Sequence, residues 1–114
     1  MRYVLHQHDT VRNNPHQDLR FELENGTVRS FAIPKGLPKE MGLNRLAIEG
    51  KPHTLECLTF EGEIEKGYGK GTLKIITSGE YLDADGLFEF ELEGLGTFKL
   101  FPFKDNHLIR KTHD

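Results

Sequence analysis

The most constraining feature of the sequence is a strict alternation of apolar and charged residues between positions 18 and 23. The apolar positions are Leu19, Phe21 and Leu23. Side chains two residues apart lie on the same face of an extended strand, so this pattern predicts a strand with one buried face. The Asn25-Gly26 pair that follows is a strong hairpin signal, because both positions of a type I′ turn require positive φ. We therefore expect strands at 18–24 and 27–33, joined by a tight turn.

Short strands separated by turn residues are predicted along the rest of the chain. Further extended segments are expected at 3–8, 45–49, 54–60, 72–77, 80–82, 88–92, 98–100 and 107–112. Turns are expected at 34–36, 50–52, 78–79, 83–86, 95–96 and 104–106, and the glycine-rich residues 61–71 are expected to form a loop. No stretch shows the periodicity of an amphipathic helix. This pattern is typical of a single all-β domain, residues 1–114, built as an antiparallel barrel or sandwich.

The composition is that of a soluble globular domain, with 36% hydrophobic and 29% charged residues in a chain of 114. No apolar run approaches the ~20 residues of a membrane span, so no membrane partner is expected. The single Cys57 excludes an internal disulfide framework and fits a cytoplasmic location. A net charge of -3 argues against a broad electrostatic grip on nucleic acid, but leaves room for a local site with a metal ion and a few arginines.

A candidate metal site is formed by His8, His16 and Asp18. The loop between the two histidines contains Asn13-Asn14-Pro15, which favours a turn that returns the second histidine to the first. Two imidazoles and one carboxylate suit Mn²⁺, Fe²⁺, Co²⁺ or Zn²⁺ and leave coordination positions open for water or substrate. The same residues also describe the solvated face of an edge strand. As a metal site, they also fit a non-haem iron oxygenase.

Three cationic or titratable residues could act beside this cluster. Arg20 is expected on the same strand face as Asp18, Arg45 begins another predicted strand, and His53 follows a proline turn. Guanidinium groups bind phosphate oxygens in bidentate fashion, and a histidine can donate a proton or contact a phosphate. Glu22 could orient Arg20 or a ligand histidine from behind. For each residue the alternative interpretation is an ordinary solvated side chain.

A set of motifs runs in order along nearly the whole chain. His-Asp-x-x-Arg stands at 8–12 and His-x-Asp-x-Arg-x-Glu at 16–22. They are followed by Ser30-Phe31-Ala32-Ile33-Pro34-Lys35-Gly36, Arg45-Leu46-Ala47, His53, Phe60-Glu61-Gly62, Tyr68-Gly69-x-Gly71-Thr72 and Leu108-Ile109-Arg110-Lys111. One such motif is weak, but the ordered set is specific. The chain resembles the 3′-phosphoesterase domain family of bacterial DNA ligase D and stand-alone archaeal homologues.

The resemblance implies an all-β fold: a small, mostly antiparallel β-barrel with short connecting turns and at most short helical turns. It implies a Mn²⁺-dependent enzyme of DNA repair, with Co²⁺ or Zn²⁺ as other candidate metals. Such an enzyme removes a 3′-terminal ribonucleoside by phosphodiesterase action and then the 3′-phosphate, leaving a 3′-OH. The implied partners are 3′ ends of DNA or RNA/DNA primer-templates and a separate DNA ligase or polymerase. By the same resemblance His8, His16 and Asp18 hold the metal, while Arg20, Arg45 and His53 surround the scissile phosphate.

The chain also departs from the family pattern. The gap between the first two motif histidines is longer here, and the glycine-rich loop is shorter. Cys57 stands where the family often has a tyrosine, and no long basic N-terminal arm is present. These differences keep a second function open: a binding module for nucleic-acid ends or repair partners whose catalytic site has decayed.

Overall fold

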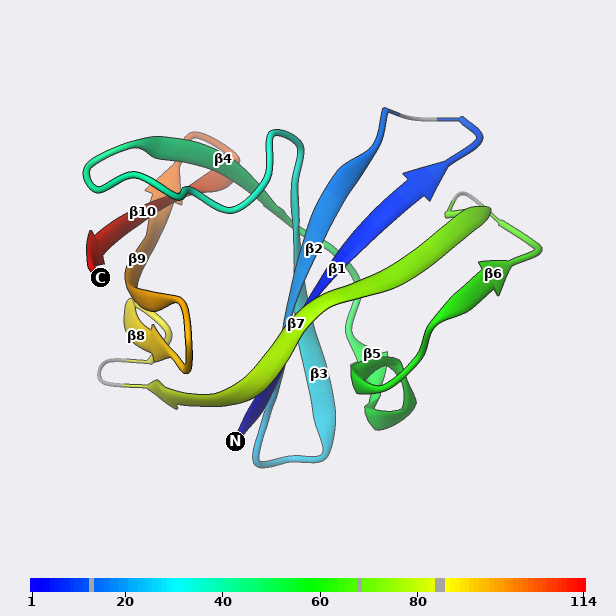
Figure 1. Ribbon diagram of the computed structural model, residues 1–114, viewed down its shortest axis with the longest axis horizontal. Coiled ribbons are helices and arrows are strands. Elements are labelled where there is room, and N and C mark those ends of the chain that lie inside the picture. The colour runs from blue at the N-terminus through cyan, green and yellow to red at the C-terminus, as the bar shows by residue number, and fades with distance from the viewer. Residues whose placement is uncertain (13, 68, 84–85) are drawn as a thin grey trace.

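The computed structural model describes residues 1–12, 14–67, 69–83 and 86–114. Eight strands in these ranges form the main body: β1 (Arg2–Thr10), β2 (His16–Glu22), β3 (Thr27–Ile33), β4 (Asn44–Glu49), β7 (Gly71–Asp83), β8 (Glu89–Leu92), β9 (Gly96–Phe103) and β10 (Asn106–His113). They pair in the order β1-β2-β3-β4-β10-β9-β8-β7, and β7 pairs with β1 to close an antiparallel barrel (Figure 1). The prediction of an all-β antiparallel barrel is confirmed.

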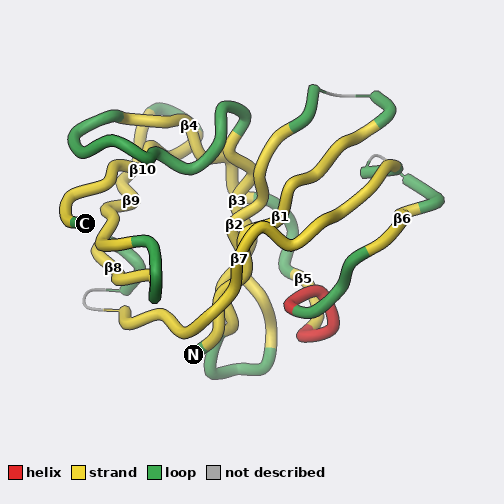
Figure 2. The backbone as a smooth tube through the Cα atoms, viewed as in Figure 1, coloured by secondary structure: helices red, strands yellow, loops and turns green. Residues whose placement is uncertain are grey.

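Three short elements lie outside the closed ring. They are β5 (His53–Thr54), the 3₁₀ helix η1 (Leu55–Leu58) and β6 (Gly62–Ile64). β5 pairs with β3 and β6 pairs with β7, so the chain from 53 to 64 passes beside β1, β2 and β3 (Figures 1 and 2). In the described ranges no helix has the length and apolar character needed to cross a membrane.

The barrel interior is filled by aromatic side chains. Phe21, Phe31, Phe90 and Phe98 are each no more than 1% exposed. The Phe21 ring meets Phe31 and Phe90 edge to face, with centroids 6.2 and 5.0 Å apart. This geometry favours the aromatic quadrupoles and fills the space between strands. The alternating apolar face predicted at 18–23 therefore points into the barrel.

Two sequence-based expectations about strands are wrong. Residues 54–60 were expected to be extended, but the chain forms η1 after Thr54, because Leu58 packs on Val4 and Val28. Residues 78–79 were expected to turn, but β7 continues through them. Gly79 pairs with Tyr3, and a Cβ at this position would lie 2.7 Å from a carboxylate oxygen of Glu93. This glycine therefore allows a close approach inside a strand rather than a turn.

Two further expectations concern loops. The glycine-rich residues 61–71, expected to form a loop, also contain the short edge strand β6. The turn expected at 83–86 includes Ala84 and Asp85, which lie outside the described residues.

Candidate functional site

Buried polar side chains gather on the outer face of β1, β2 and β3. They are His6, His8, Asp18, Arg20 and Ser30, each no more than 7% exposed. Their neighbours Leu5, Leu19 and Phe31 point into the barrel core, so alternation places the polar set on the other side of the sheet. The strand register puts them in facing pairs: His6 with Asp18, and Arg20 with Ser30. The covering segment, η1 and the residues after it as far as Phe60, lies over this face.

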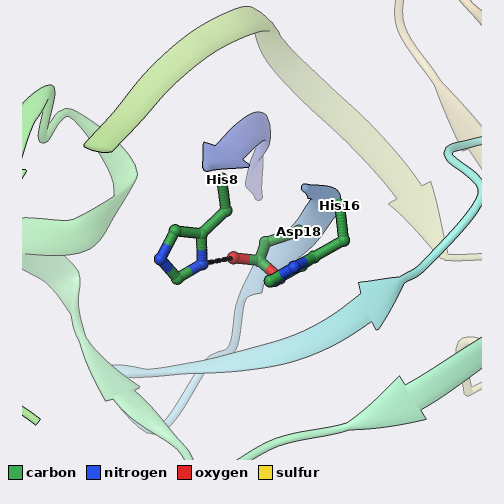
Figure 3. A group of neighbouring side chains, drawn as sticks. All are labelled: His8, His16 and Asp18. Carbon is green, nitrogen blue, oxygen red and sulfur yellow. Dashed lines mark hydrogen bonds and ion pairs between the residues drawn. The ribbon is translucent and has the colours of Figure 1, made fainter. Parts of the chain in front are cut away.

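The three residues of the predicted metal site lie together (Figure 3). His8 and His16 face each other across β1 and β2, with ring centroids 4.8 Å apart. His8 Nδ1 is 2.9 Å from Asp18 Oδ2, and His16 Nε2 is 3.1 Å from Asp18 Oδ1. One candidate ligand atom from each residue lies within 4.8 Å of the others. The loop containing Pro15 thus returns His16 to His8. Asn13 of that loop lies outside the described residues.

The outward nitrogens of both imidazoles meet backbone carbonyls. His8 Nε2 donates to the carbonyl of Gly69 at 2.8 Å, and His16 Nδ1 donates to the carbonyl of Asn14 at 3.2 Å. In a neutral imidazole the other nitrogen then carries a lone pair. Both lone pairs face the Asp18 carboxylate, an arrangement that is favourable only when a proton or a cation lies between these groups. Histidine ligands in metal sites are oriented by hydrogen bonds of this kind. The donor set therefore fits a divalent transition metal.

Arg20 is held beside the cluster by three side chains. Its Nη2 donates to Asp18 Oδ2 at 3.1 Å, its Nε donates to Ser30 Oγ at 3.2 Å, and its Nη1 donates to His6 Nδ1 at 2.7 Å. A guanidinium has five N–H groups, so these bonds leave two for another ligand. Because the side chain is buried and fixed in a fork, it is prepared to bind an oxyanion without reorganisation.

His6 is a member of this site that the sequence analysis did not assign. It is fully buried, and its Nε2 donates to the carbonyl of Phe60 at 2.8 Å. Burial lowers the pKa of His6, and the Arg20 cation lowers it further. A neutral imidazole can accept the bond from Arg20. The available signal was positional: His6 lies two residues before His8 and therefore shares its strand face.

His53 lies at the edge of the same site. It pairs with Val28 through β5 and β3, and its side chain is exposed. Desolvation lowers the pKa of His53, and the Arg20 cation lowers it further, against a smaller raising effect of Asp18. The charges of both site residues therefore act on this imidazole, as expected for a group bordering the cluster.

Two other predicted site residues do not join the cluster. Arg45 lies on the face of β4 that also carries the buried Ala47, and its Nη1 donates to the carbonyl of Lys35. Glu22, which was predicted to orient Arg20 or a histidine, is bound by Arg2 in the structure. Its carboxylate accepts bonds of 3.0, 3.1 and 3.2 Å from the backbone and guanidinium of Arg2. It ends β2, about 20 Å along the strand from His16 at ~3.3 Å per residue.

Cys57 borders the site on its apolar side. The thiol packs with Val4, Val28 and Leu58, and burial raises its pKa. The Arg20 cation acts in the opposite direction on the same group. Cys57, which stands where a tyrosine was expected, thus packs with the small apolar cluster and is close enough to Arg20 to be affected by its charge.

The fold and the site together define a closed antiparallel β-barrel with a histidine–aspartate cluster and a buried arginine on one outer face. The chain belongs to the family described as the DNA Ligase D 3′-phosphoesterase domain, whose sequence model matches residues 6–108. This membership confirms the resemblance seen in the sequence motifs.

Individual relatives agree with this assignment. The chain is 43% identical to the multifunctional non-homologous end joining protein LigD of Mycolicibacterium smegmatis over 70% of its length, and 44% identical to LigD of Mycobacterium tuberculosis over 69%. It is 36% identical to LigD of Pseudomonas aeruginosa over 96% of its length. The chain spans only 10–13% of the length of these relatives.

Proposed function

We propose that this domain is a metal-dependent phosphoesterase that processes 3′ ends of nucleic acids in DNA end-joining repair. It removes a 3′-terminal ribonucleoside, leaving a 3′-phosphate, and then removes that phosphate to leave a 3′-OH. One observation carries the proposal: two imidazole nitrogens converge on Asp18 while the same carboxylate binds a buried arginine. Family membership supports the reaction class.

His8 Nδ1, His16 Nε2 and an Asp18 oxygen are the atoms that would hold Mn²⁺, or Co²⁺ or Zn²⁺ in its place. A bound divalent cation supplies charge neutralisation for a phosphate oxygen as negative charge develops in the transition state. The chain contributes the orientation: the Gly69 and Asn14 carbonyls hold each imidazole with its inner nitrogen toward the carboxylate.

Arg20 binds the phosphate through the N–H groups that its protein partners leave unused. Since Asp18, Ser30 and His6 fix three of its donors, little entropy is lost when a phosphate binds. Its positive charge also draws the phosphate toward the cluster. Arg45 has no role at the reacting phosphate in this proposal, because its guanidinium lies beside the Lys35 carbonyl and not beside Asp18 and Arg20.

His53 contacts the phosphate or the leaving oxygen as a neutral N–H donor. The lowered pKa of this imidazole supports a donor that is uncharged at neutral pH, rather than a stored proton. A general-acid role requires the proton to be bound during the reaction, which the Arg20 cation opposes.

The proposal is tested by following product chemistry. The substrate is a primer-template whose primer ends in a single 3′-ribonucleotide, with MnCl₂ or with EDTA. We expect a primer shortened by one nucleoside that first carries a 3′-phosphate and later a 3′-OH, in the Mn²⁺ reaction alone. Absence of both products with Mn²⁺, Co²⁺ and Zn²⁺ would contradict the proposal.

A non-catalytic binding module is the second candidate, and Cys57 is the observation that favours it. A thiol packed in an apolar cluster replaces the tyrosine that the family often has. In that case primer-templates bind with no product formed, and Mn²⁺ binds weakly in a calorimetric titration. A DNA ligase or polymerase is the proposed partner in either case, because the relatives are named as multifunctional end joining proteins.

A further inference from the structure

Two hollows lie side by side near the start of β2, on the face of the sheet opposite to the histidine cluster. One is a polar groove of about 370 Å³, and the other is an apolar pocket of about 270 Å³. Gln17, Leu37 and Lys39 line both of them, so the two form one continuous surface. We call this surface the groove.

The groove concentrates positive charge in a protein of net charge -3. Four of the fifteen Lys and Arg residues line it: Lys35, Lys39, Arg45 and Lys111. Among the Asp and Glu residues that the structure describes, Glu40 alone lines it as well, and Asp114 pairs with Lys111 from outside the lining. The local charge is therefore opposite to that of the whole chain, which marks a site for an anionic ligand.

The apolar end of the groove is an opening into the barrel. Its walls include Leu37, Pro38, Ile76 and Leu95, with the buried Phe98 ring behind them. A ligand that fills both parts must therefore combine negative charge with an apolar group. An unpaired nucleic-acid strand has both, because its phosphates alternate with bases whose ring faces are apolar and, in a single strand, are free of a pairing partner.

A rigid contact fixes the cationic loop against β2. Gln17 Oε1 accepts a hydrogen bond of 2.8 Å from the backbone N–H of Leu37. Gly36, at φ +87°, lies against the side-chain amide of Gln17, and an added Cβ would stand 3.2 Å from that amide. Lys35 and Lys39 are thus presented by a segment that is already ordered.

The groove is separated from the candidate metal site by one strand. Gln17 lies between His16 and Asp18 in β2 and points to the opposite face of the sheet. A nucleic acid whose 3′ end enters the cluster therefore needs only to pass the start of β2 for its unpaired strand to reach the groove.

We propose that the groove binds an unpaired nucleic-acid strand, with phosphates on Lys35, Lys39 and Arg45 and a base in the apolar pocket. The proposal deepens the proposed function, on which the choice of a nucleic-acid ligand rests. An acidic peptide is the competing ligand class. A purely acidic peptide, such as polyglutamate, matches the charges but has no apolar side chain for the pocket.

The test measures binding of a fluorescent oligothymidylate in EDTA, so that neither metal binding nor turnover affects the result. The protein variants are wild type, Lys35→Gln/Lys39→Gln, Arg45→Gln, and the control Lys99→Gln/Lys104→Gln, which changes two lysines outside the groove. The slope of log K against log salt is negative, and removing two phosphate contacts should reduce its magnitude by roughly 1.4, at ~0.7 for each single-strand phosphate. The control should keep the wild-type slope. Thermal unfolding checks that each variant is folded.

Three outcomes would overturn the proposal: an unchanged slope in the double variant, an equal loss in the control, or equal competition by polyglutamate of the same charge. These outcomes are independent of the reaction. A protein that binds the oligonucleotide through the groove but forms no product contradicts the proposed function alone.

Discussion

Nη1 of Arg20 donates a 2.7 Å hydrogen bond to Nδ1 of His6, and both side chains are buried. The histidine accepts this bond only when its proton is on Nε2, where the Phe60 carbonyl receives it. A continuous chain of hydrogen bonds thus runs from the covering segment through His6 to Arg20 and on to Asp18. It explains why a buried cation is tolerated here: each neighbour supplies an acceptor.

His6→Leu should disturb this arrangement more than His6→Gln. Leucine leaves an arginine N–H and the Phe60 carbonyl without partners, at about 1–3 kcal/mol for each buried group. Glutamine offers both an acceptor and a donor. We expect the inhibition constant of inorganic phosphate to rise about tenfold in the leucine variant, and clearly less in the glutamine variant, together with a lower free energy of unfolding in urea. Equal inhibition constants for wild type and both variants would show that Arg20 does not depend on His6.

Asp18→Asn should weaken both Mn²⁺ binding and the fold. The substitution keeps the side-chain shape but removes the charge that faces two imidazoles and Arg20. Removing one partner of a buried ion pair typically costs about 3–5 kcal/mol. The control is Asp9→Asn, because Asp9 is exposed and its carboxylate accepts a hydrogen bond from Gln7. Calorimetric titration with Mn²⁺ should show binding to the control and none to Asp18→Asn; matching affinities would remove Asp18 from the metal site.

His53→Gln should retain part of the activity that His53→Ala loses. A neutral N–H donor can be replaced by an amide, whereas a proton donor cannot. Since the pKa of His53 is lowered from 6.5, its imidazole is neutral at pH 7 and above. Titration of His53 should therefore cause no loss of kcat between pH 7 and 8. A decline over that range in wild type that is absent from His53→Gln would instead identify His53 as a general acid.

The Arg2–Glu22 pair should make stability depend on pH in acid. Hydrogen bonds from Arg2 lower the pKa of Glu22 below its ordinary 4.5. Between the folded and unfolded pKa values the unfolded chain binds the additional proton, so stability falls as pH drops. The contribution is complete above about pH 4.5 and is lost as the pH falls through the lower folded pKa. The free energy of unfolding, measured by urea denaturation at pH 3 to 6, should depend less steeply on pH in Glu22→Gln than in wild type. An identical pH dependence in the two proteins would contradict the role of the pair.

Much of the architecture was readable from the sequence because strand periodicity is a local property. The alternation around Phe21 fixed which face of β2 enters the core, and the Asn25-Gly26 pair fixed the hairpin to β3. The limits were tertiary. The 3₁₀ turn at Leu55–Leu58 depends on packing against Val4 and Val28, and the extension of β7 through Gly79 depends on its pairing with Tyr3 of β1.

The site shows the same division. His8, His16 and Asp18 were predictable, because their spacing on paired strands brings them together. The role of His6 was not predictable from spacing, since it depends on Phe60 and Arg20 approaching from other segments. A residue at the expected position of a motif can also form its hydrogen bonds with a residue outside the site. Glu22 has the right alternation, but Arg2 lies directly beside it on β1.

We propose that His8, His16 and Asp18 hold the metal needed for cleavage of a 3′-terminal phosphoester. The most direct measurement is the single-turnover rate of ribonucleoside release from a 3′-ribonucleotide primer-template with Mn²⁺, in wild type, His16→Ala and His113→Ala. His113 is an exposed histidine in β10 and serves as the control. We predict a loss of about a hundredfold or more in His16→Ala, since metal stabilisation is worth several kcal/mol, and no change in His113→Ala. Equal rates in all three proteins would contradict the account.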